Sequence, residues 1–257
     1  MIYRRINITF LFIFSISFLI DWFYFPLPWW IYFGATLVYL GIVTYGVVKI
    51  DSQFFIPVIF KAGILKSEVA ITFDDGPHPQ RTPYILDILK EYDAKAAFFC
   101  IGKNVDENPD IVRRIHKEGH LLGNHSFFHS DFFDFQSTKK MEEELSMTDD
   151  AIKEVSGRKP RFFRPPYGVT NPRLAKVVKN RNYVSVGWSL RSLDTIIKNE
   201  KRLFNKIKKR IKPGDIILFH DHSVVLTDIL PEILEYIRNI GLKIVRVDEL
   251  IEEKPYA

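Results

Sequence analysis

The chain has 257 residues with one cysteine, 47% hydrophobic and 26% charged residues and a formal net charge of +5. This composition excludes a disordered or low-complexity chain, a disulfide framework and a multi-cysteine zinc site. Residues 1–67 carry five basic and two acidic side chains and the rest carries 31 basic and 29 acidic ones, so the larger part is nearly neutral and we expect no nucleic-acid partner.

The N-terminal part predicts two membrane-spanning helices. Residues 29–48 contain no charge, and twenty residues at 1.5 Å rise span roughly 30 Å, the hydrocarbon thickness of a bilayer. Residues 6–20 form a shorter apolar run behind Arg4 and Arg5, and this run lengthens if Asp21 lies at the interface. A Pro-Leu-Pro sequence between the runs indicates a turn.

The anchor has alternatives. The first run also fits a signal-peptide core, although no small-x-small cleavage site follows, and the pair fits two buried helices of a soluble protein. Basic residues near the N-terminus place it in the cytoplasm, so two spans return the rest of the chain there and one span puts it outside. We expect a membrane anchor over residues 1–49, a lead-in over residues 50–67, and an undetermined membrane side.

From residue 68 onward, strand-like and helix-like segments alternate. Short apolar runs predict seven strands, at residues 69–73, 96–101, 120–124, 161–163, 183–188, 215–219 and 242–247. Helical periodicity and end signals predict helices at residues 82–92, 108–119, 137–155, 171–179, 201–211 and 230–240. This alternation predicts one α/β domain over residues 68–257, built on a parallel sheet or barrel.

Polar residues follow several of these strands. In parallel sheets, ligands bind at the carboxyl ends of the strands, so these residues are expected to meet at one end of the fold. They are Asp74, Asp75, His125, Arg164, Asp194, His220 and Asp221.

Two of these polar residues, together with His129, suit a metal ion. His125 and His129 stand four residues apart, and on a helical turn both imidazoles would lie on one face. Together with Asp75 they form a two-histidine, one-carboxylate set, which suits Zn²⁺ and also Co²⁺, Ni²⁺ or Mn²⁺. Asp74 and Asp75 are adjacent, so their side chains diverge and one can bind a metal while the other works as a base. Each motif alone is common in surface helices and turns, so the combination carries the hypothesis.

Four motifs occur in a fixed order along the chain. They are Thr-Phe-Asp-Asp-Gly-Pro at 72–77, His-Ser-Phe-Phe-His at 125–129, Arg-Pro-Pro-Tyr-Gly at 164–168 and Leu-Phe-His-Asp at 218–221. This order resembles the motifs of the polysaccharide deacetylases, carbohydrate esterase family 4 with the NodB homology domain, over about residues 68–250. The resemblance implies a deformed seven-stranded (β/α) barrel.

The resemblance also implies roles for the site residues. Asp75, His125 and His129 would hold a divalent metal, usually zinc. Asp74 would be the base that deprotonates the attacking water, and Arg164 would pair with this base.

Further roles concern the acetyl group and the leaving amine. The resemblance implies that the backbone N–H of Tyr167 stabilises the oxyanion and that Leu218 packs against the acetyl methyl group. His220 would protonate the leaving amine, which gives acetate and a free amino sugar. Asp194 would orient His220 and favour its protonated form.

One motif departs from the family. The family commonly has Asp-x-x-Asp-Trp before the last motif, whereas this chain has Arg191 and Thr195 at the first and last of these positions and retains Asp194. The missing tryptophan leaves open whether the groove takes a typical long glycan. Trp188 either supplies an aromatic surface there or belongs to the core.

Other residues carry weaker signals. A phenylalanine cluster at 127, 128, 132, 133 and 135 fits either core packing or a lip that contacts sugar rings or acyl chains. We expect His78, His116 and His222 to be peripheral, His120 to be a strand residue, and Cys100 to be a buried small hydrophobe.

The sequence therefore predicts a membrane-anchored, metal-dependent hydrolase that uses metal-activated water to remove N-acetyl groups from an amino-sugar glycan or glycolipid. The altered motif favours an alternative, a metal-dependent hydrolase of another acyl or cyclic-amide substrate. A non-catalytic sugar-binding membrane protein is a third hypothesis, although such a protein would be expected to have lost site residues. Oligomeric state is not predicted.

Overall fold

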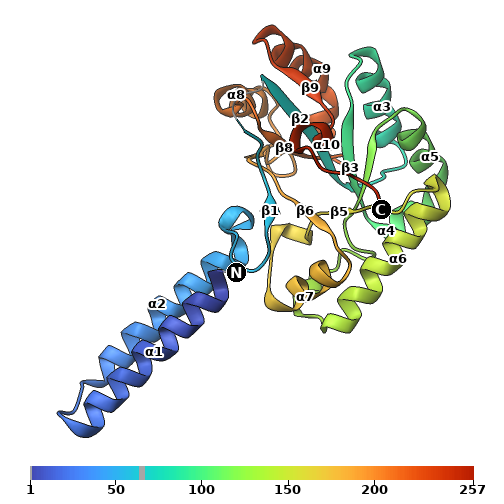
Figure 1. Cartoon of the computed structure of the whole chain (residues 1–257). Helices are drawn as coiled ribbons and strands as arrows, with labels where there is room; N and C mark the ends of the chain where they lie inside the picture. Colours follow the sequence, from blue (N-terminus) through green and yellow to red (C-terminus); the bar gives the residue numbers. More distant parts are fainter. Residues whose placement is uncertain (1, 64–66) are drawn as a thin grey trace.

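The computed structural model describes residues 2–63 and 67–257. A hairpin of two long helices extends from a rounded body, and the N-terminus lies at the end of the hairpin that adjoins the body (Figure 1). Helix α1 spans Ile2–Phe23 and α2 spans Trp29–Val48. Both predicted N-terminal helices are present, and α2 has the predicted bounds.

The hairpin is long and apolar enough to cross a membrane. Both helices meet the length and hydropathy expected of spans, and almost none of their residues are buried inside the molecule. Between the helices, Tyr39 donates a hydrogen bond to Asn7 Oδ1 (2.9 Å) and its ring stacks on Phe10. The Asp21 carboxylate accepts a hydrogen bond from Leu27 N–H in the turn, at the end far from the body. The single acidic residue of the hairpin thus lies at its end.

The body is a curled parallel sheet covered by helices, a half-barrel of the kind expected (Figure 1). The strand order is β1-β6-β5-β4-β3-β2-β8-β7, with β9 paired to β2, and every pairing between strands in the described part of the chain is parallel. The strands are β1 Val58–Ile59, β2 Glu68–Gly76, β3 Ala96–Cys100, β4 Leu121–Asn124, β5 Phe162–Phe163, β6 Val184–Val186, β7 Leu190–Arg191, β8 Ile216–His220 and β9 Lys243–Val245. All seven predicted strands are confirmed, while β1 and β7 were not predicted.

The helices of the body follow the predicted periodicity with three differences. They are α3 Arg81–Glu91, α4 Gly102–Glu107, α5 Pro109–Lys117, α6 Thr138–Ser156, α7 Pro172–Asn180, α8 Glu200–Arg210, α9 Val224–Asn239 and α10 Val247–Ile251, with 3-10 turns η1 Ile50–Ser52, η2 Phe133–Phe135 and η3 Pro166–Gly168. Helix α9 begins six residues before the predicted start, because the Ser223 side chain caps it by accepting from Leu226 N–H. The short helices α4 and α10 were not predicted, and α10 takes Val247 from the expected last strand.

Alternation along β2 directs the polar residues inward. Val69, Ile71 and Phe73 belong to the core between sheet and helices, whereas Ala70 belongs to the core inside the curl. Asp74 is two and four positions from Thr72 and Ala70, so its side chain shares their inner face.

A bulge then re-aims the next residue. The pairing of β2 with β3 shifts between Asp74 and Gly76, and Asp75 has a φ of 71°. Adjacent residues of a regular strand point to opposite faces, but a bulge changes the direction of one of them. This bulge lets two adjacent aspartates serve the same site.

The base of the hairpin is attached to the body. Ile50, Phe54 and Phe55 are buried in a small core with residues of α7, and β1 pairs with β6. Thr170 N–H donates to Val47 O (3.0 Å), so the loop after η3 is tied to the end of α2. Residues 50–59, expected as a lead-in, therefore pack on the body, and the domain boundaries stay a prediction.

Candidate active site

The sequence-predicted site residues lie around one cavity at the carboxyl ends of the strands. The cavity has a volume of about 210 Å³. It is lined by Asp74, Asp75, His125, His129, Tyr167, Gly168, Trp188, Arg191, Thr195, Leu218, His220 and His222. Two further predicted residues, Arg164 and Asp194, are fully buried and bond to side chains of this cavity.

Three side chains form a set of metal donors. One donor atom from each of Asp75, His125 and His129 lies within 4.8 Å of the others. Asp75 Oδ1 is 3.5 Å from His125 Nε2 and 3.4 Å from His129 Nε2. The expectation of a helical turn was wrong: the histidines lie in a loop after β4, where Ser126 and His129 have φ of 62° and 48°. These left-handed residues bring the imidazoles together.

A backbone contact fixes the tautomer of His125. Its Nδ1 lies 2.8 Å from the carbonyl oxygen of Arg164, which can only accept, so Nδ1 carries the proton. In the neutral ring, Nε2 then presents its lone pair towards Asp75. This is the arrangement that a metal-binding histidine needs.

The charges in the donor set favour a cation. Burial alone would raise the pKa of Asp75, but the hydrogen bond and charge of His125 and the charge of His129 lower it. Burial lowers the pKa of His125, yet the carboxylates of Asp74 and Asp75 outweigh this and raise it. Burial and the nearby His125 lower the pKa of His129 to about 4, so this ring is neutral near pH 7. Two close carboxylates therefore create a negative potential between the imidazoles.

Asp74 is held by a fully buried arginine. Arg164 Nη1 donates to Asp74 Oδ1 (2.7 Å) and to Thr72 Oγ1 (2.8 Å). Its Nε donates to Val186 O (3.0 Å), and its Nη2 donates to Gly187 O (2.8 Å). Burial lowers the pKa of the guanidinium, and the Asp74 charge opposes this shift. The second carboxylate oxygen of Asp74 lies 3.7 Å from His125 Nε2, on the cavity side.

His220 and Asp194 form a second pair, in which the aspartate is buried and the histidine is partly exposed to the cavity. His220 Nδ1 lies 2.9 Å from Asp194 Oδ1, and the His220 backbone N–H donates to Asp194 Oδ2 (2.9 Å). Ser192 donates to Asp194 Oδ1 (2.7 Å), which fixes the carboxylate. Burial lowers the pKa of His220, but the hydrogen bond and charge of Asp194 outweigh this and raise it. The imidazole is thus oriented through Nδ1 and biased towards its protonated form.

Tyr167 and Leu218 complete the wall of the cavity. Tyr167 has a φ of 57°, and the turn around it is closed by hydrogen bonds from Gly168 and Val169 N–H groups. Within the described residues, no hydrogen bond of this turn uses the Tyr167 backbone N–H. The Tyr167 ring packs on that of His129, with 4.6 Å between the ring centres, and its hydroxyl donates to Asp131 Oδ1 (2.9 Å). Leu218 is buried and lines the same cavity.

The expectation that His222 is peripheral was wrong. Its Nδ1 lies 3.7 Å from Asp75 Oδ2, and it lines both the central cavity and a neighbouring one of about 390 Å³. That neighbouring cavity is also lined by Asp75, His78 and Asn104. Residue 222 lies in the turn after β8, where the alternation of a strand no longer predicts which way a side chain points, so the sequence carried no signal for this placement.

Asp221 belongs to the scaffold rather than to the cavity. It is fully buried, accepts a hydrogen bond from Thr82 Oγ1, and lies outside the lining. Burial raises its pKa to about 7. A Cβ atom at Gly76 would clash with the Asp221 carboxylate, so the Asp-Asp-Gly turn closes directly over it.

The residues of the altered motif line the cavity. Arg191 and Thr195 both face it, and the Arg191 guanidinium lies 5.9 Å from the centre of the Trp188 ring. Trp188 lines the cavity and also packs against the core that joins hairpin and body, so both suggested roles apply. A Cβ atom at Gly168, where φ is 73°, would lie 2.5 Å from this ring.

The remaining weak signals divide between core and surface. Phe127 and Phe133 are buried, whereas the other three members of the phenylalanine cluster are exposed, namely Phe128, Phe132 and Phe135. Cys100 is fully buried, and burial raises the pKa of its thiol. His120 is buried just before β4 and accepts from Ala96 N–H (3.1 Å).

Comparison with known proteins identifies the family. The model for polysaccharide deacetylases matches residues 63–186. A peptidoglycan-N-acetylglucosamine deacetylase of Bacillus cereus is 36% identical over 195 residues, which cover 72% of this chain and 89% of that protein. The chain belongs to the polysaccharide deacetylase family. It is thus a carbohydrate deacetylase-like hydrolase, and the resemblance seen in its motifs is confirmed.

Other members of the polysaccharide deacetylase family show the same relation. A chitooligosaccharide deacetylase of Azorhizobium caulinodans is 38% identical over 157 residues, covering 61% of this chain and 74% of that protein. A solved peptidoglycan N-acetylglucosamine deacetylase superposes with a TM-score of 0.75 at 30% identity, covering 78% of this chain and 95% of that one. A solved CE4 family pseudoenzyme from Bacillus anthracis superposes with a TM-score of 0.71 at 26% identity, covering 77% and 70%. The family fold thus occurs with and without activity.

Proposed function

We propose that this chain removes N-acetyl groups from an amino-sugar glycan or glycolipid in a metal-dependent reaction at a membrane surface. The observation that carries the proposal is the convergence of three functional groups on one cavity. These are the donor set of Asp75 and two histidines, the Asp74–Arg164 pair and the His220–Asp194 pair. A non-catalytic member would not need all three.

The donor set fits a divalent cation. Ligands about 2.0–2.1 Å from a tetrahedral Zn²⁺ lie roughly 3.4 Å apart. The separations of Asp75 Oδ1 from His125 Nε2 and His129 Nε2 are 3.5 and 3.4 Å. Zn²⁺ suits this set best, and Co²⁺, Ni²⁺ or Mn²⁺ also accept such ligands. A cation held there supplies a Lewis acid, which polarises the acetyl carbonyl and acidifies a water.

The side chains of this chain supply the proton transfers. Asp74, oriented by Arg164, takes a proton from the water that attacks the acetyl carbon. The developing oxyanion accepts a hydrogen bond from the backbone N–H of Tyr167, because the turn does not use this donor. His220 donates its proton to the amide nitrogen as the carbon–nitrogen bond breaks, and Asp194 stabilises the imidazolium before the transfer. The products are acetate and an amino sugar.

The substrate follows from the relatives and from the cavity. Relatives are named for peptidoglycan N-acetylglucosamine and for chitooligosaccharide, so an N-acetylated amino sugar is the proposed substrate class. Leu218 offers an apolar contact for the acetyl methyl group. Arg191 lines the cavity and can donate hydrogen bonds. It therefore favours the alternative, another acyl or cyclic-amide substrate that carries an acceptor group.

The hairpin supports membrane attachment. Helix α1 has 22 residues and α2 has 20, enough to cross the hydrocarbon core at 1.5 Å per residue. Exposed tryptophans at positions 22, 29 and 30 gather at the turn, as expected at a membrane interface. Two spans would leave the N-terminus and the body on the same side.

One experiment tests the chemistry. The purified full chain is incubated with N-acetylglucosamine oligomers, peptidoglycan and glycolipids, and acetate release is measured by mass spectrometry. We expect release that is lost on chelation and restored by Zn²⁺, and about one ion per chain by elemental analysis. Asp74→Asn should retain the metal but lose turnover by at least about 100-fold, the size of a general-base effect. Full activity without metal, or full activity of Asp74→Asn, would refute the mechanism.

A further inference from the structure

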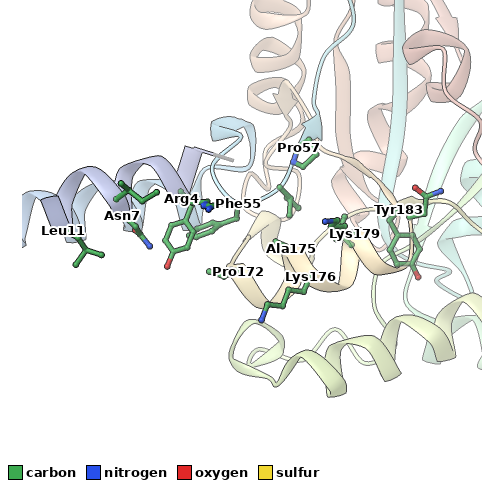
Figure 2. Close-up of a pocket in the computed structure, with 15 residues that line it drawn as sticks. Arg4, Asn7, Leu11, Phe55, Pro57, Pro172, Ala175, Lys176, Lys179 and Tyr183 are labelled. Atoms are coloured by element: carbon green, nitrogen blue, oxygen red, sulfur yellow. The ribbon is translucent and has the colours of Figure 1, made fainter.

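A large groove lies between the hairpin and the body, away from the proposed reaction. Its volume is about 970 Å³, and it is lined by one side of α1, by residues 55–57 and by α7 with the residues after it (Figure 2). The residues of the active-site cavity do not line it. A candidate membrane span thus forms one wall of an open groove.

The wall and floor of the groove are apolar. Ile8 and Leu11 of α1 are 58% and 62% exposed, and Ile56 and Val178 line the opposite side. The wall is fixed to the body at its first turn, because the Tyr3 ring packs on that of Phe55 (4.7 Å) and Tyr3 N–H donates to a carbonyl of the same segment. The groove is therefore a preformed apolar surface that continues along α1.

The rim of the groove is cationic. Arg4, Lys176 and Lys179 line it and are exposed, and none of them forms an ion pair within the described residues. Lys176 and Lys179 are three positions apart on α7 and so lie on one face of the helix. Figure 2 shows them on the helix that faces the start of α1, where Arg4 lies. The lining in the described part of the chain contains no acidic residue.

We propose that this groove binds an anionic glycerophospholipid. The phosphate lies between Arg4 and the two lysines of α7, and the acyl chains follow Ile8 and Leu11 into the bilayer. The occupant must match both parts of the groove: a soluble anion would leave the apolar wall exposed to water, and a zwitterionic lipid would bring its own ammonium group to a rim that already carries three cations. The groove is continuous with α1, so a lipid reaches it from the bilayer without leaving the membrane.

Such a lipid would brace the body against the membrane. Helix α7 follows the segment that carries Arg164 and Tyr167, and Thr170 in that segment is bonded to the end of α2 through Val47 O. The hairpin, the lipid-binding helix and one wall of the active-site cavity therefore belong to one connected unit. The inference rests on the membrane insertion proposed above, but not on the chemistry of the active site.

The test uses the full chain in detergent, stripped of lipid and offered phosphatidylglycerol or phosphatidylcholine with the same acyl chains. Native mass spectrometry should show clear preference for phosphatidylglycerol. Replacing both groove lysines, K176Q with K179Q, should weaken that binding roughly 30-fold, and R4Q alone roughly fivefold. A matched control, K201Q with K209Q on the exposed face of α8, removes the same charge and should leave binding unchanged.

Several outcomes would overturn the inference. Equal binding of the two lipids would show that the cationic rim does not recognise the headgroup. An equal loss of binding in the α8 control would show that only the net charge of the protein matters. Competition by inorganic phosphate at the lipid's own concentration would identify a free-anion site. If the double variant K176Q with K179Q has a lower melting temperature, its loss of binding could reflect lost stability, and the loss of binding by R4Q then decides the test. Release of the chain from membranes by alkaline carbonate would refute membrane insertion and this inference together, while acetate release reports on the catalytic proposal separately.

Discussion

Replacing Arg164 by lysine should destabilise the body strongly, although the charge is kept. The Arg164 guanidinium is fully buried and lies 4.0 Å above the Phe99 ring. It donates to Asp74, to Thr72 and to two backbone carbonyl oxygens, those of Val186 and Gly187. A lysine ammonium can reach the carboxylate but not, at the same time, the two carbonyls, because it lacks the planar fork of donors.

The size of the effect follows from the groups left behind. Each buried acceptor that loses its donor costs about 1–3 kcal/mol, so two carbonyls give about 4 kcal/mol of lost unfolding free energy. For a body of this size, 1 kcal/mol shifts the melting temperature by about 2–4 °C, which predicts a fall of about 8–16 °C. Deacetylation measured below the new melting temperature should also fall, because Asp74 loses its fixed orientation.

Thermal unfolding of the purified full chain, followed by circular dichroism, measures this shift. Arg173→Lys is the matched control: Arg173 is exposed and also donates to two carbonyls, Phe135 O (3.0 Å) and Gln136 O (3.2 Å). Its replacement should cost less than about 0.5 kcal/mol, as expected at a surface position. A melting temperature of Arg164→Lys within about 2 °C of the wild type, or an equal fall in the control, would refute the reasoning.

Three further predictions concern the site. Asp194→Asn removes the cause that raises the pKa of His220, so the alkaline limb of kcat/KM should move to lower pH, and an unshifted limb would exclude His220 as the acid. His125→Ala should leave less than about a tenth of the bound metal found in the wild type by elemental analysis, because one of three donors is gone; unchanged metal content would contradict the ligand set. Gly168→Ala places a Cβ 2.5 Å from the Trp188 ring at a φ of 73°, so we expect a loss of about 1–3 kcal/mol in chemical denaturation together with reduced kcat, and wild-type values for both would be unexpected.

Most of the strands could be predicted from the sequence, but two of them could not, and the reason is physical. Short apolar runs marked the seven main strands, and the charge-free run of residues 29–48 marked α2, because periodicity and hydropathy are local properties of the chain. The strand β1 lies in an apolar run that Pro57 interrupts, and β7 has only two residues, one of them an arginine, so neither shows the pattern of a strand by itself. Their pairing with β6 and β8 depends on neighbours distant in the sequence.

The set of site residues was determined by the sequence. Strands of a parallel sheet end at a common edge, so polar residues after β2, β4 and β8 had to converge, and the order of the four motifs resembles one family. Asp74, Asp75, His125, His129 and His220 are therefore predictable from the sequence alone, and all five line one cavity.

The way these residues meet was decided only by the tertiary structure. A bulge at Asp75 and a left-handed φ at His129 aim the metal donors, where the spacing alone suggested a helical turn. His222 enters the lining and Asp221 is buried behind it, a choice that depends on how the end of β8 packs against the turn after β2. Spacing along the chain determines which side chains can meet, but backbone angles and packing across the sheet determine where they point.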